Sequence, residues 1–473
     1  MKNLTIETIT LVCKGRLYIG DQSLLTEELG QKEATAVVLD SRLLVFGGVF
    51  IATRGERVDG HKFIPQVLEK GALAVICEEL PEVLTGPCIL VEDSFQALKD
   101  IASFYRSQLD IKVIGITGSV GKTSTKECIA GVLSEKYRLW KTQGNFNNEV
   151  GLPLTILQIR QEHELAVLEM GISQFGEMHR LSAIAKPDIC VITNIGQCHL
   201  EALGDRDGVL RAKSEILDFW NPEGLVCVNG DDDKLITLKE KLGERLVTFG
   251  RGSANDYHTL NETSLGLLGS RIHIGGRMEV EELRIPLPGE HMVLNALAAA
   301  AVADALGLSA EEIRKGMRMV EAVAGRSHIL PLKDYVLIDD CYNANPVSMK
   351  AALDLLQEAE GRRVAILGDM FELGEEEEKL HGEIGAYAAD GKVDLLFCVG
   401  KLSRAMYQSA FEFSAKKEEK ASDFVQERLQ YTESKEELYP LLAQHLHPGD
   451  TILLKASHGM HFEEIVEWLK VRE

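Results

Sequence analysis

Residues 115–125 form a glycine-rich turn whose residue types suit the binding of a nucleoside triphosphate. They read Gly-Ile-Thr-Gly-Ser-Val-Gly-Lys-Thr-Ser-Thr and lie between a β-branched run and a helical pattern. Gly118 and Gly121 let the backbone curl so that successive N–H groups face a phosphate chain, and the helix N-terminus adds positive potential. Lys122 supplies a mobile positive charge, and Thr123 offers a hydroxyl to a magnesium ion. The predicted triphosphate-binding residues are Thr117, Gly118, Ser119, Val120, Gly121, Lys122, Thr123 and Ser124.

Polar side chains follow two further apolar runs in the central part of the chain. Ligands of open parallel sheets bind beyond the carboxyl ends of the strands, so these positions are candidates for a site. Glu169 ends the run Leu-Ala-Val-Leu, and its carboxylate could complete a magnesium shell that Thr123 begins. A capping or loop carboxylate is the alternative interpretation. Asn194 and His199 follow the next run, and their presence in one loop favours a ligand role over a structural one.

Three other side chains have two interpretations each when only the residues are considered. Lys213 stands in Ala-Lys-Ser-Glu-Ile on a predicted helix, where an exposed lysine is the simpler interpretation. Asn295 lies on the most alanine-rich helix, and its amide could meet an adenine edge or a backbone carbonyl. Arg326 could bind a γ-phosphate bidentately or form an interdomain salt bridge.

The last third of the chain carries polar loops after two apolar runs. The first loop contains Asp340, Asn343 and Asn345, and the second contains Asp369 and Glu372. Two acidic residues in one crevice suit an amine better than an anion, because like charges repel. We therefore expect this part of the chain to receive a cationic group.

The rhythm of apolar runs divides the chain into three α/β parts, which predicts three domains. Residues 1–91 alternate short strands and turns, as is typical of a small α/β domain. Residues 92–325 combine the glycine-rich turn with continuous apolar strands, which predicts a parallel sheet covered on both faces. Residues 326–473 restart the rhythm, and we expect a doubly wound, Rossmann-like domain there. The predicted strands are 36–39, 49–52, 73–77, 88–91, 165–170, 189–193, 225–229, 335–339, 364–367, 395–399 and 451–454.

The composition is acidic, with 51 Lys and Arg against 73 Asp and Glu in 473 residues and a formal net charge of −22. Such a surface disfavours a nucleic-acid backbone or an anionic membrane as partner, so an anionic ligand needs local basic residues. The nine cysteines are scattered singles, which indicates neither a zinc site nor a disulfide framework. The chain shows no signal-peptide or membrane-span pattern. We expect a cytoplasmic, monomeric protein.

Taken together, these segments resemble the Mur ligases, the ATP-dependent enzymes that form amide bonds in the peptide stem of the bacterial cell-wall precursor. Residues 117–123 resemble that family's phosphate loop, in which the position of Ile116 is not the glycine of the commonest P-loop pattern. The resemblance spans nearly the whole chain. Residues of the family's site occur here in the family's order: Glu169, Asn194, His199, Lys213, Asn295, Arg326 and Asp340.

Within the family, the chain looks most like the last ligase of the series, which joins D-alanyl-D-alanine to UDP-N-acetylmuramoyl-tripeptide. The segments that carry this likeness are 144–153, 339–346 and 367–374. Segments 39–42 and 55–61 resemble a nucleotide-sugar domain that the preceding ligase shares. The resemblance implies that Ser41 and Arg42 bind the uridine diphosphate end of the substrate. Further candidate substrate residues are Asn147, Asn148, Asn343, Asn345, Asp369 and Glu372.

The resemblance also implies a mechanism, in which the tripeptide carboxylate attacks the γ-phosphate of ATP and the dipeptide amine displaces the resulting acyl phosphate. Lys122 and the loop amides would hold the phosphates, while Thr123 and Glu169 would hold a first Mg²⁺. His199 would help to hold a second Mg²⁺, and Lys213 would carry a carbamate near it. The remaining nucleotide contacts would come from Asn295 to adenine, Asp340 to the ribose and Arg326 to the γ-phosphate.

One departure from the family pattern lies near the C-terminus, where Lys-Ala-Ser-His at 455–458 replaces a usual Lys-Gly-Ser-Arg. We expect Ala456 to restrict a turn that glycine allows, and His458 to change how the loop holds an anionic part of the substrate.

Two other functions stay open. The first is the preceding ligase, which adds the third amino acid of the stem. Its diaminopimelate-adding form usually carries Asp-Asn-Pro-Arg, and neither Asn-Pro dipeptide of this chain has that context. The second is a P-loop regulatory ATPase. A GTPase switch would normally carry Asn-Lys-x-Asp, and the chain contains no Asn-Lys dipeptide.

Overall fold

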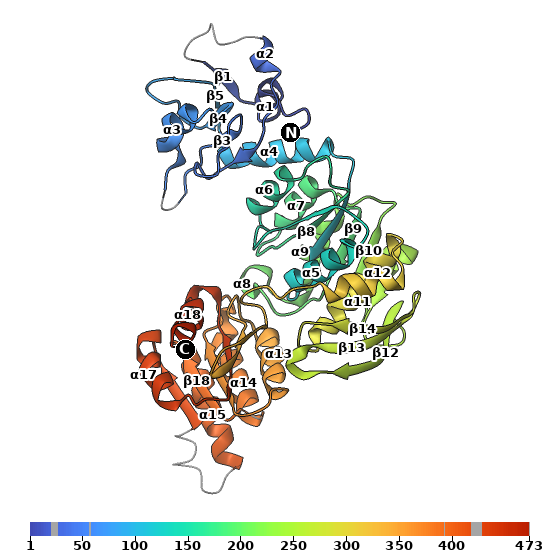
Figure 1. Ribbon diagram of the computed structural model, residues 1–473, viewed down its shortest axis with the longest axis vertical. Coiled ribbons are helices and arrows are strands. Elements are labelled where there is room, and N and C mark those ends of the chain that lie inside the picture. The colour runs from blue at the N-terminus through green and yellow to red at the C-terminus, as the bar shows by residue number, and fades with distance from the viewer. Residues whose placement is uncertain (20–26, 56–57, 392, 418–427, 473) are drawn as a thin grey trace.

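The computed structural model describes residues 1–19, 27–55, 58–391, 393–417 and 428–472. Three β-sheets follow one another along the chain, and helices pack on each of them (Figure 1). The N-terminal, central and C-terminal domains lie in that order along the elongated molecule, which confirms the expected three-domain α/β fold. Residues 56 and 57 of the segment 55–61 lie outside the described residues. None of the described helices combines the length and apolar character that a membrane crossing needs.

The N-terminal sheet is parallel from β2 to β5, and β1 runs antiparallel to β5. The four strands predicted here are present, while β1 is an addition to the prediction. In sheet order the strands are β1 (Arg16–Tyr18), β5 (Cys88–Leu90), β4 (Ala74–Cys77), β3 (Val49–Ile51) and β2 (Val37–Val38). The helices are α1 (Ile6–Val12), α2 (Glu27–Gly30), the 3₁₀ helix η2 (Gly60–Phe63) and α3 (Ile64–Glu69).

The central sheet has nine strands. They are, in sheet order, β14 (Val280–Ile285), β13 (Ser270–Gly276), β12 (Tyr257–Ser264), β11 (Leu246–Phe249), β10 (Leu225–Asn229), β9 (Ile189–Ile192), β6 (Lys112–Thr117), β8 (Leu165–Glu169) and β7 (Leu139–Lys141). The strands from β7 to β12 are parallel, but β12, β13 and β14 pair antiparallel. The prediction of a parallel sheet is therefore wrong at this edge. Strand β14 alternates between buried and exposed residues, so a search for continuous apolar runs misses it.

The helices of the central domain surround this sheet, and α11 packs against α5. Helix α11 is buried almost all round because its alanines permit close approach on every side. The helices are α4 (Ser94–Ser107), α5 (Lys122–Leu133), α6 (Gly151–Leu157), α7 (Glu177–Ala185), α8 (Leu200–Leu203), α9 (Arg206–Ser214), η3 (Glu215–Leu217), η4 (Leu235–Leu238), α10 (Lys239–Leu242), η5 (Gly243–Arg245), η6 (Gly266–Leu268), α11 (His291–Ala305) and α12 (Ala310–Arg318).

The C-terminal sheet is parallel except for β15, which runs antiparallel to β16. The four predicted strands are present, with β15 and β19 as additions. In sheet order the strands are β15 (His328–Pro331), β16 (Tyr335–Asp339), β20 (Asp450–Lys455), β17 (Arg363–Gly368), β18 (Leu395–Val399) and β19 (Leu429–Thr432). The helices are α13 (Pro346–Gln357), η7 (Gly374–Glu376), α14 (Glu377–Asp390), α15 (Ser403–Lys417), α17 (Lys435–His445), η8 (His458–Met460) and α18 (Glu463–Val471).

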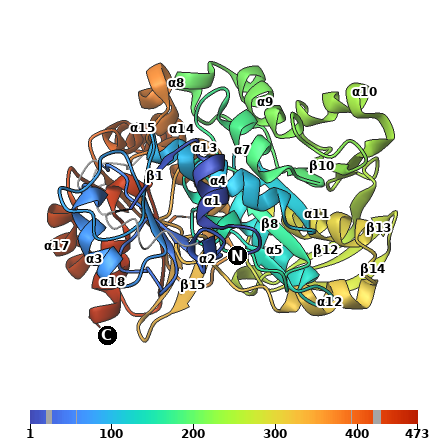
Figure 2. The same ribbon diagram turned by 90° about the horizontal axis from the view of Figure 1, so that it is seen from above.

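The N-terminal and central domains share a hydrophobic core, whereas the C-terminal domain has cores of its own. One cluster runs from Val49 of the N-terminal sheet through Ile101 of α4 to Leu168 of the central sheet. The C-terminal domain has two separate clusters, and Leu267 of η6 is the one hydrophobic residue of the central domain, among those described, that packs against them. The division at residues 91 and 325 stays a proposal. Figure 1 and Figure 2 both place α8 of the central domain beside the C-terminal domain.

Candidate active site between the central and C-terminal domains

A cavity of about 570 Å³ lies between the central and C-terminal domains, within the size range of cofactor and substrate pockets. The loops after β6, β8 and β9 form its central wall, and the loop after β16 forms the opposite wall. The predicted site residues that line it are Ser119, Val120, Gly121, Lys122, Thr123, Ser124, Asn147, Asn148, Glu169, Asn194, His199, Asn295, Arg326, Asp340, Asn343 and Asn345.

Two glycines with positive φ give the turn between β6 and α5 its shape. Gly118 has a φ of 149° and Gly121 a φ of 81°. A Cβ on Gly118 would collide with Oγ1 of Thr193, so a side chain there would displace the neighbouring strand end. Gly121 immediately precedes α5, whose first turn has N–H groups without helical partners. The turn therefore presents backbone donors at the cavity wall.

Asn194 holds the phosphate loop in place from the side. Its Oδ1 accepts a hydrogen bond from the Val120 amide at 3.0 Å, and its Nδ2 donates to the Val120 carbonyl at 3.0 Å. The hydroxyl of Thr193 donates to the same carbonyl at 2.7 Å. Lys122 lies along the loop, with Nζ donating to the Gly118 carbonyl at 2.9 Å. Asn194 thus supports the loop through both the oxygen and the nitrogen of its side-chain amide.

Thr123 and Glu169 form an oxygen-rich pair at the floor of the cavity. The Thr123 hydroxyl donates to Glu169 Oε2 at 2.9 Å, and Asn147 Nδ2 donates to Glu169 Oε1 at 2.8 Å. Glu169 is only 1% exposed. Strands β6 and β8 are neighbours, which explains why the residue that ends one strand meets the helix that follows the other. A hydroxyl beside a buried carboxylate is a donor set that suits Mg²⁺.

Lys213 is buried on α9, with 1% of its surface exposed. Burial and the nearby charge of Lys122 lower the pKa of Lys213 to about 8. Among the described residues, no carboxylate pairs with Lys213 and no acceptor takes a hydrogen bond from it. The exposed position that the residues alone favour for Lys213 is therefore wrong. A buried amine without a counterion is unusual, because desolvation opposes its charge.

His199 completes this group on the central side of the cavity. Its pKa is lowered by burial, against the opposing effect of Glu372, and the charges of Lys213 and Lys122 lower it further. Its Nδ1 lies 2.7 Å from Oε2 of Glu372, which belongs to the C-terminal domain. His199, Lys213 and Lys122 therefore share one electrostatic environment, although they come from three separate segments.

The C-terminal wall of the cavity presents cationic side chains beside Asp340. The guanidinium of Arg326 stacks on the ring of Tyr342, 4.0 Å from its centroid. Asp340 accepts from the Ser327 amide at 2.9 Å and from Lys455 Nζ at 2.7 Å. These contacts orient the Asp340 carboxylate, and they leave the edge of the Arg326 guanidinium as a fork for an anion.

Asn295 lies on α11 at the cavity, and its amide has a side-chain partner within the protein. Its Oδ1 accepts from the Thr125 hydroxyl at 2.9 Å, and its Nδ2 faces the sulfur of Met292 at 3.2 Å. Only a weak acceptor therefore meets Nδ2, so the amide keeps hydrogen-bonding capacity.

Comparison with known proteins identifies the family. The Mur ligase family catalytic domain matches residues 33–106, the Mur ligase middle domain matches 116–303, and the Mur ligase glutamate ligase domain matches 325–458. A UDP-N-acetylmuramoyl-tripeptide–D-alanyl-D-alanine ligase of Bacillus subtilis (strain 168) is 37% identical over 98% of this chain and 97% of its own length. The chain belongs to the Mur ligase family.

Solved structures of other Mur ligases share the whole arrangement. A crystal structure of MurF from Acinetobacter baumannii has a TM-score of 0.86 at 31% identity and covers 99% of both chains. MurF ligase from Thermotoga maritima in complex with ADP has a TM-score of 0.76 at 27% identity, covering 94% of this chain and 99% of that one. The family resemblance read from the motifs is thereby confirmed.

Lys455, Tyr342 and His291 are among the cavity-lining residues of this Mur ligase that the prediction missed. Lys455 is 2% exposed and donates to Asp340 and to the Asn343 carbonyl, so it joins two predicted site residues. It ends β20, and the rule that points to strand ends would have found it. Tyr342 offers no signal in the sequence, because its contact with Arg326 depends on the folded loop.

The departure near the C-terminus has a clear structural setting. Ala456 is fully buried beside Phe462, and its φ is not positive. The expectation that Ala456 restricts a turn reserved for glycine is therefore wrong. His458 begins η8, with its ring centroid 5.5 Å from that of Tyr342. Its effect on substrate binding stays a prediction.

Several predicted residues lie away from the cavity lining. Thr117 and Gly118 are not part of the lining, and the buried Thr117 hydroxyl has no hydrogen-bond partner among the described residues. Ser41 and Arg42 lie in the N-terminal domain, where Arg42 pairs with Asp40 at 2.7 Å and is 85% exposed. The structure does not bring them to the nucleotide cavity, and their role with the nucleotide sugar stays a prediction.

Asp369 and Glu372 follow the same strand but make different contacts. Asp369 is 5% exposed and accepts from the amide and the hydroxyl of Ser403, each at 2.7 Å. It does not line the cavity and serves the C-terminal domain internally. Glu372 instead reaches His199 across the domain boundary. The expectation that both face a substrate amine stays a prediction, with neither carboxylate at the cavity lining.

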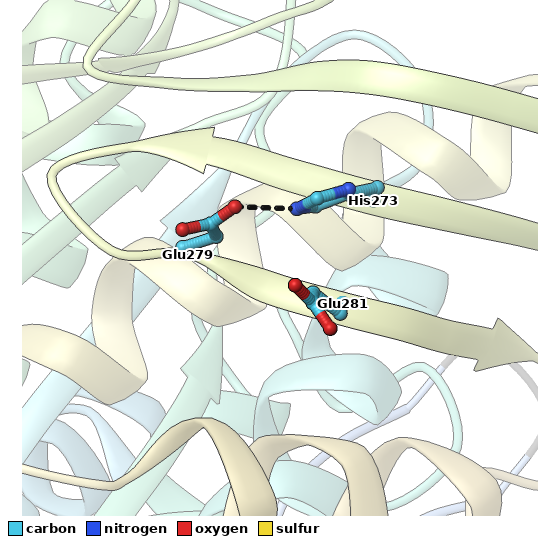
Figure 3. Close-up of side chains that lie close together, drawn as sticks. All are labelled: His273, Glu279 and Glu281. Carbon is cyan, nitrogen blue, oxygen red and sulfur yellow. Dashed lines mark hydrogen bonds and ion pairs between the residues drawn. The ribbon is translucent and has the colours of Figure 1, made fainter.

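A second group of ligand-type side chains lies on the hairpin of β13 and β14 (Figure 3). His273, Glu279 and Glu281 bring their ligand atoms within 4.8 Å of one another, and His273 Nε2 lies 2.9 Å from Glu279 Oε1. Both glutamates are exposed and His273 is partly exposed. Surface ion pairs of this kind are common, so we assign no metal site to this group.

Proposed function

We propose that this Mur ligase uses ATP to join D-alanyl-D-alanine to UDP-N-acetylmuramoyl-tripeptide, which completes the peptide stem of the peptidoglycan precursor. The observation that carries the proposal is the composition of one cavity. It combines a phosphate loop, the Thr123–Glu169 pair and the facing Arg326. The near end-to-end match with the Bacillus subtilis enzyme selects the reaction within the family.

ATP would lie across the boundary between the central and C-terminal domains. The loop amides and Lys122 would hold the β- and γ-phosphates, and Arg326 would contact the γ-phosphate from the opposite wall. Asn295 would contact adenine through its weakly engaged Nδ2. Asp340 would accept from the ribose, held in orientation by Lys455.

Magnesium fits the residues at the floor of the cavity. Thr123 and Glu169 offer a hydroxyl and a carboxylate that already lie 2.9 Å apart, and His199 would hold a second ion. A bound magnesium ion would neutralise charge on the transferring phosphoryl group.

The setting of Lys213 supports its proposed carbamate. Carbamylation needs a neutral amine, and a pKa of about 8 makes one accessible near neutral pH. The product is an anion, and the nearby charge of Lys122 would stabilise it. Lys213 has no partner among the described residues, and as a carbamate it would gain a favourable interaction with a neighbouring charge.

The chemistry would proceed in two transfers. A carboxylate oxygen of the tripeptide attacks the γ-phosphorus, and the bond to ADP breaks. The neutral amine of D-alanyl-D-alanine then attacks the acyl carbon, the nitrogen releases a proton to solvent, and phosphate leaves. The chain would contribute position and charge, since Lys122 and Arg326 face the phosphoryl group from opposite walls. Closure of the C-terminal domain would exclude water from the acyl phosphate.

The nucleotide-sugar end of the substrate would lie on the N-terminal domain. Ser41 and Arg42 would bind the uridine diphosphate there, with Arg42 as a local cation on an acidic protein. We further propose that the chain acts as a monomer in the cytoplasm.

A substrate assay separates this function from the alternatives. The protein is supplied with ATP, Mg²⁺, D-alanyl-D-alanine and UDP-N-acetylmuramoyl-tripeptide containing lysine or diaminopimelate, and ADP release and product mass are measured. We expect ADP and pentapeptide in equal amounts. ADP formed only with the dipeptide substrate and a free diamino acid would assign the preceding ligase. ATP hydrolysis that responds to a protein partner and to neither peptide would assign a regulatory ATPase.

A further inference from the structure

His199 and Glu372 form a histidine–carboxylate pair across the boundary between the central and C-terminal domains, and it is an ion pair only when His199 is protonated. His199 precedes α8, and Glu372 precedes η7. Their Nδ1 and Oε2 atoms lie 2.7 Å apart, although the residues are far apart in the sequence. His199 also lines the nucleotide cavity, whereas Glu372 does not. The carboxylate therefore reaches a cavity residue from outside the cavity.

Each partner of this pair is held by its own domain. On the central side, the Gly196 amide donates to the Ser119 hydroxyl at 2.8 Å, which ties the His199 loop to the phosphate loop. On the C-terminal side, the Phe371 amide donates to the Ser457 hydroxyl at 2.9 Å. The pair thus joins two supported loops.

The backbone at both residues reinforces this arrangement. His199 has a φ of 51° and Glu372 a φ of 62°, in the left-handed region that non-glycine residues rarely adopt. Such a conformation persists when the surrounding structure holds it in place. Both residues of the pair therefore have a backbone conformation that carries a cost and that the surrounding loops must hold.

The chemistry of imidazole makes this contact consequential. When Nδ1–H of a histidine donates to a carboxylate, the other nitrogen keeps its lone pair and the ring orientation is set. Oε2 of Glu372 lies 2.7 Å from Nδ1 of His199, so Nε2 is the nitrogen left for a ligand when Nδ1 carries the proton. This is the tautomer that a metal-binding histidine needs.

We propose that Glu372 is a positioning residue, which orients His199 for cation binding when the C-terminal domain closes on the central domain. The inference rests on the proposed ligase function and on the cation role of His199. It differs from the sequence-based expectation that Glu372 receives the substrate amine. Domain closure and completion of the metal site would then be coupled through one side chain.

A metal-binding measurement tests this without turnover. Mn²⁺ binding is followed by electron paramagnetic resonance in the presence of a non-hydrolysable ATP analogue, for wild type and Glu372→Ala. We expect the variant to bind Mn²⁺ about tenfold more weakly, as for other residues that orient metal ligands. Glu372→Gln should recover part of the affinity, because its amide oxygen can still accept from Nδ1–H. Glu375→Ala removes an exposed carboxylate three residues away and should match wild type.

A double-mutant comparison decides between the two roles of Glu372. If Glu372 acts through His199, Glu372→Ala has no further effect on Mn²⁺ affinity in a His199→Ala background. Unchanged Mn²⁺ affinity in Glu372→Ala, with a raised KM for D-alanyl-D-alanine, would overturn the proposal in favour of amine binding. If the wild-type protein does not bind the ATP analogue, the ligase function itself is refuted. Failure of the Glu372 proposal and failure of the ligase function therefore give different results.

Discussion

The two domain boundaries of this Mur ligase differ in kind. At the first, a continuous hydrophobic cluster joins the N-terminal sheet, α4 and the central domain. At the second, the C-terminal domain keeps its own clusters and meets the central domain across a polar cavity. Among the described residues, its cross-boundary contacts include the apolar Leu267 and the pair of His199 with Glu372.

The difference predicts that the N-terminal and central domains move as one unit, whereas the C-terminal domain moves relative to them. A shared apolar core makes two domains move together, whereas small polar interfaces permit relative motion. The phosphate loop and Lys213 belong to the rigid pair, while Arg326, Asp340 and Lys455 face them from the other side. A site divided in this way is completed by closure, which couples substrate binding to chemistry.

The largest expected effect concerns the polar boundary. We expect Lys213→Ala to lower kcat by about 10³-fold, because it removes the proposed carbamate from beside the charge of Lys122. An excess of a short carboxylate should restore part of the activity. Initial rates with and without formate provide the measurement, with Lys239→Ala, an exposed lysine on α10, as control. Full activity in Lys213→Ala would contradict the carbamate proposal and leave Lys213 with a structural role.

The apolar boundary should respond in stability. Ile101 is fully buried in the shared cluster, and we expect Ile101→Ala to lower the free energy of unfolding by about 2–5 kcal/mol. Leu267→Ala, at the polar boundary, should cost clearly less, because Leu267 is only partly buried. Urea unfolding of both variants measures the two losses. Equal losses would contradict the distinction between the boundaries.

Arg326 tests whether the two walls of the cavity act together in the transition state. We expect Arg326→Lys to lower kcat by about tenfold, because a lysine cannot reproduce the planar fork that stacks on Tyr342. Binding of ATP, measured by calorimetry, should change little. A matching loss of affinity and turnover would point to ground-state binding alone.

The lowered pKa of Lys213 sets a pH dependence for its carbamylation. Burial brings the pKa from 10.5 to about 8, so the neutral amine is a minority at pH 7 and increases as the pH rises. Between pH 7 and 8 the neutral fraction rises about fivefold, and the initial rate of labelled CO2 uptake, measured at a fixed concentration of dissolved CO2, should follow it. Carbon-13 NMR of the protein measures that uptake, with Lys213→Gln as control. A rate independent of pH in this range would refute the prediction.

The smallest expected effect belongs to the N-terminal domain. Arg42 is exposed and already paired with Asp40, so its contact with a diphosphate replaces one surface ion pair by another. We expect Arg42→Ala to raise KM for the nucleotide-sugar substrate about threefold with kcat unchanged. Steady-state kinetics with Lys2→Ala as control measures this. A large fall in kcat would place Arg42 in the chemistry.

The accuracy of the predicted fold follows the burial of its strands. Strands covered on both faces, such as β6, β8 and β18, have continuous apolar residues that periodicity detects. The edge strands β13 and β14 are half-exposed, and β1, β15 and β19 are short or partly polar. Their pairing depends on neighbours that are distant in the sequence, which no local pattern records.

The sequence by itself determined the chemistry of this protein. Residue type and position at strand ends are enough to find the phosphate loop, Glu169, His199 and Arg326. Their chemistry depends on local backbone and side-chain identity, which the sequence records. Only the tertiary structure decided that Lys213 is buried, that Lys455 holds Asp340, and that Glu372 reaches His199. Those facts arise from desolvation and from contacts between separate domains, which depend on packing in three dimensions.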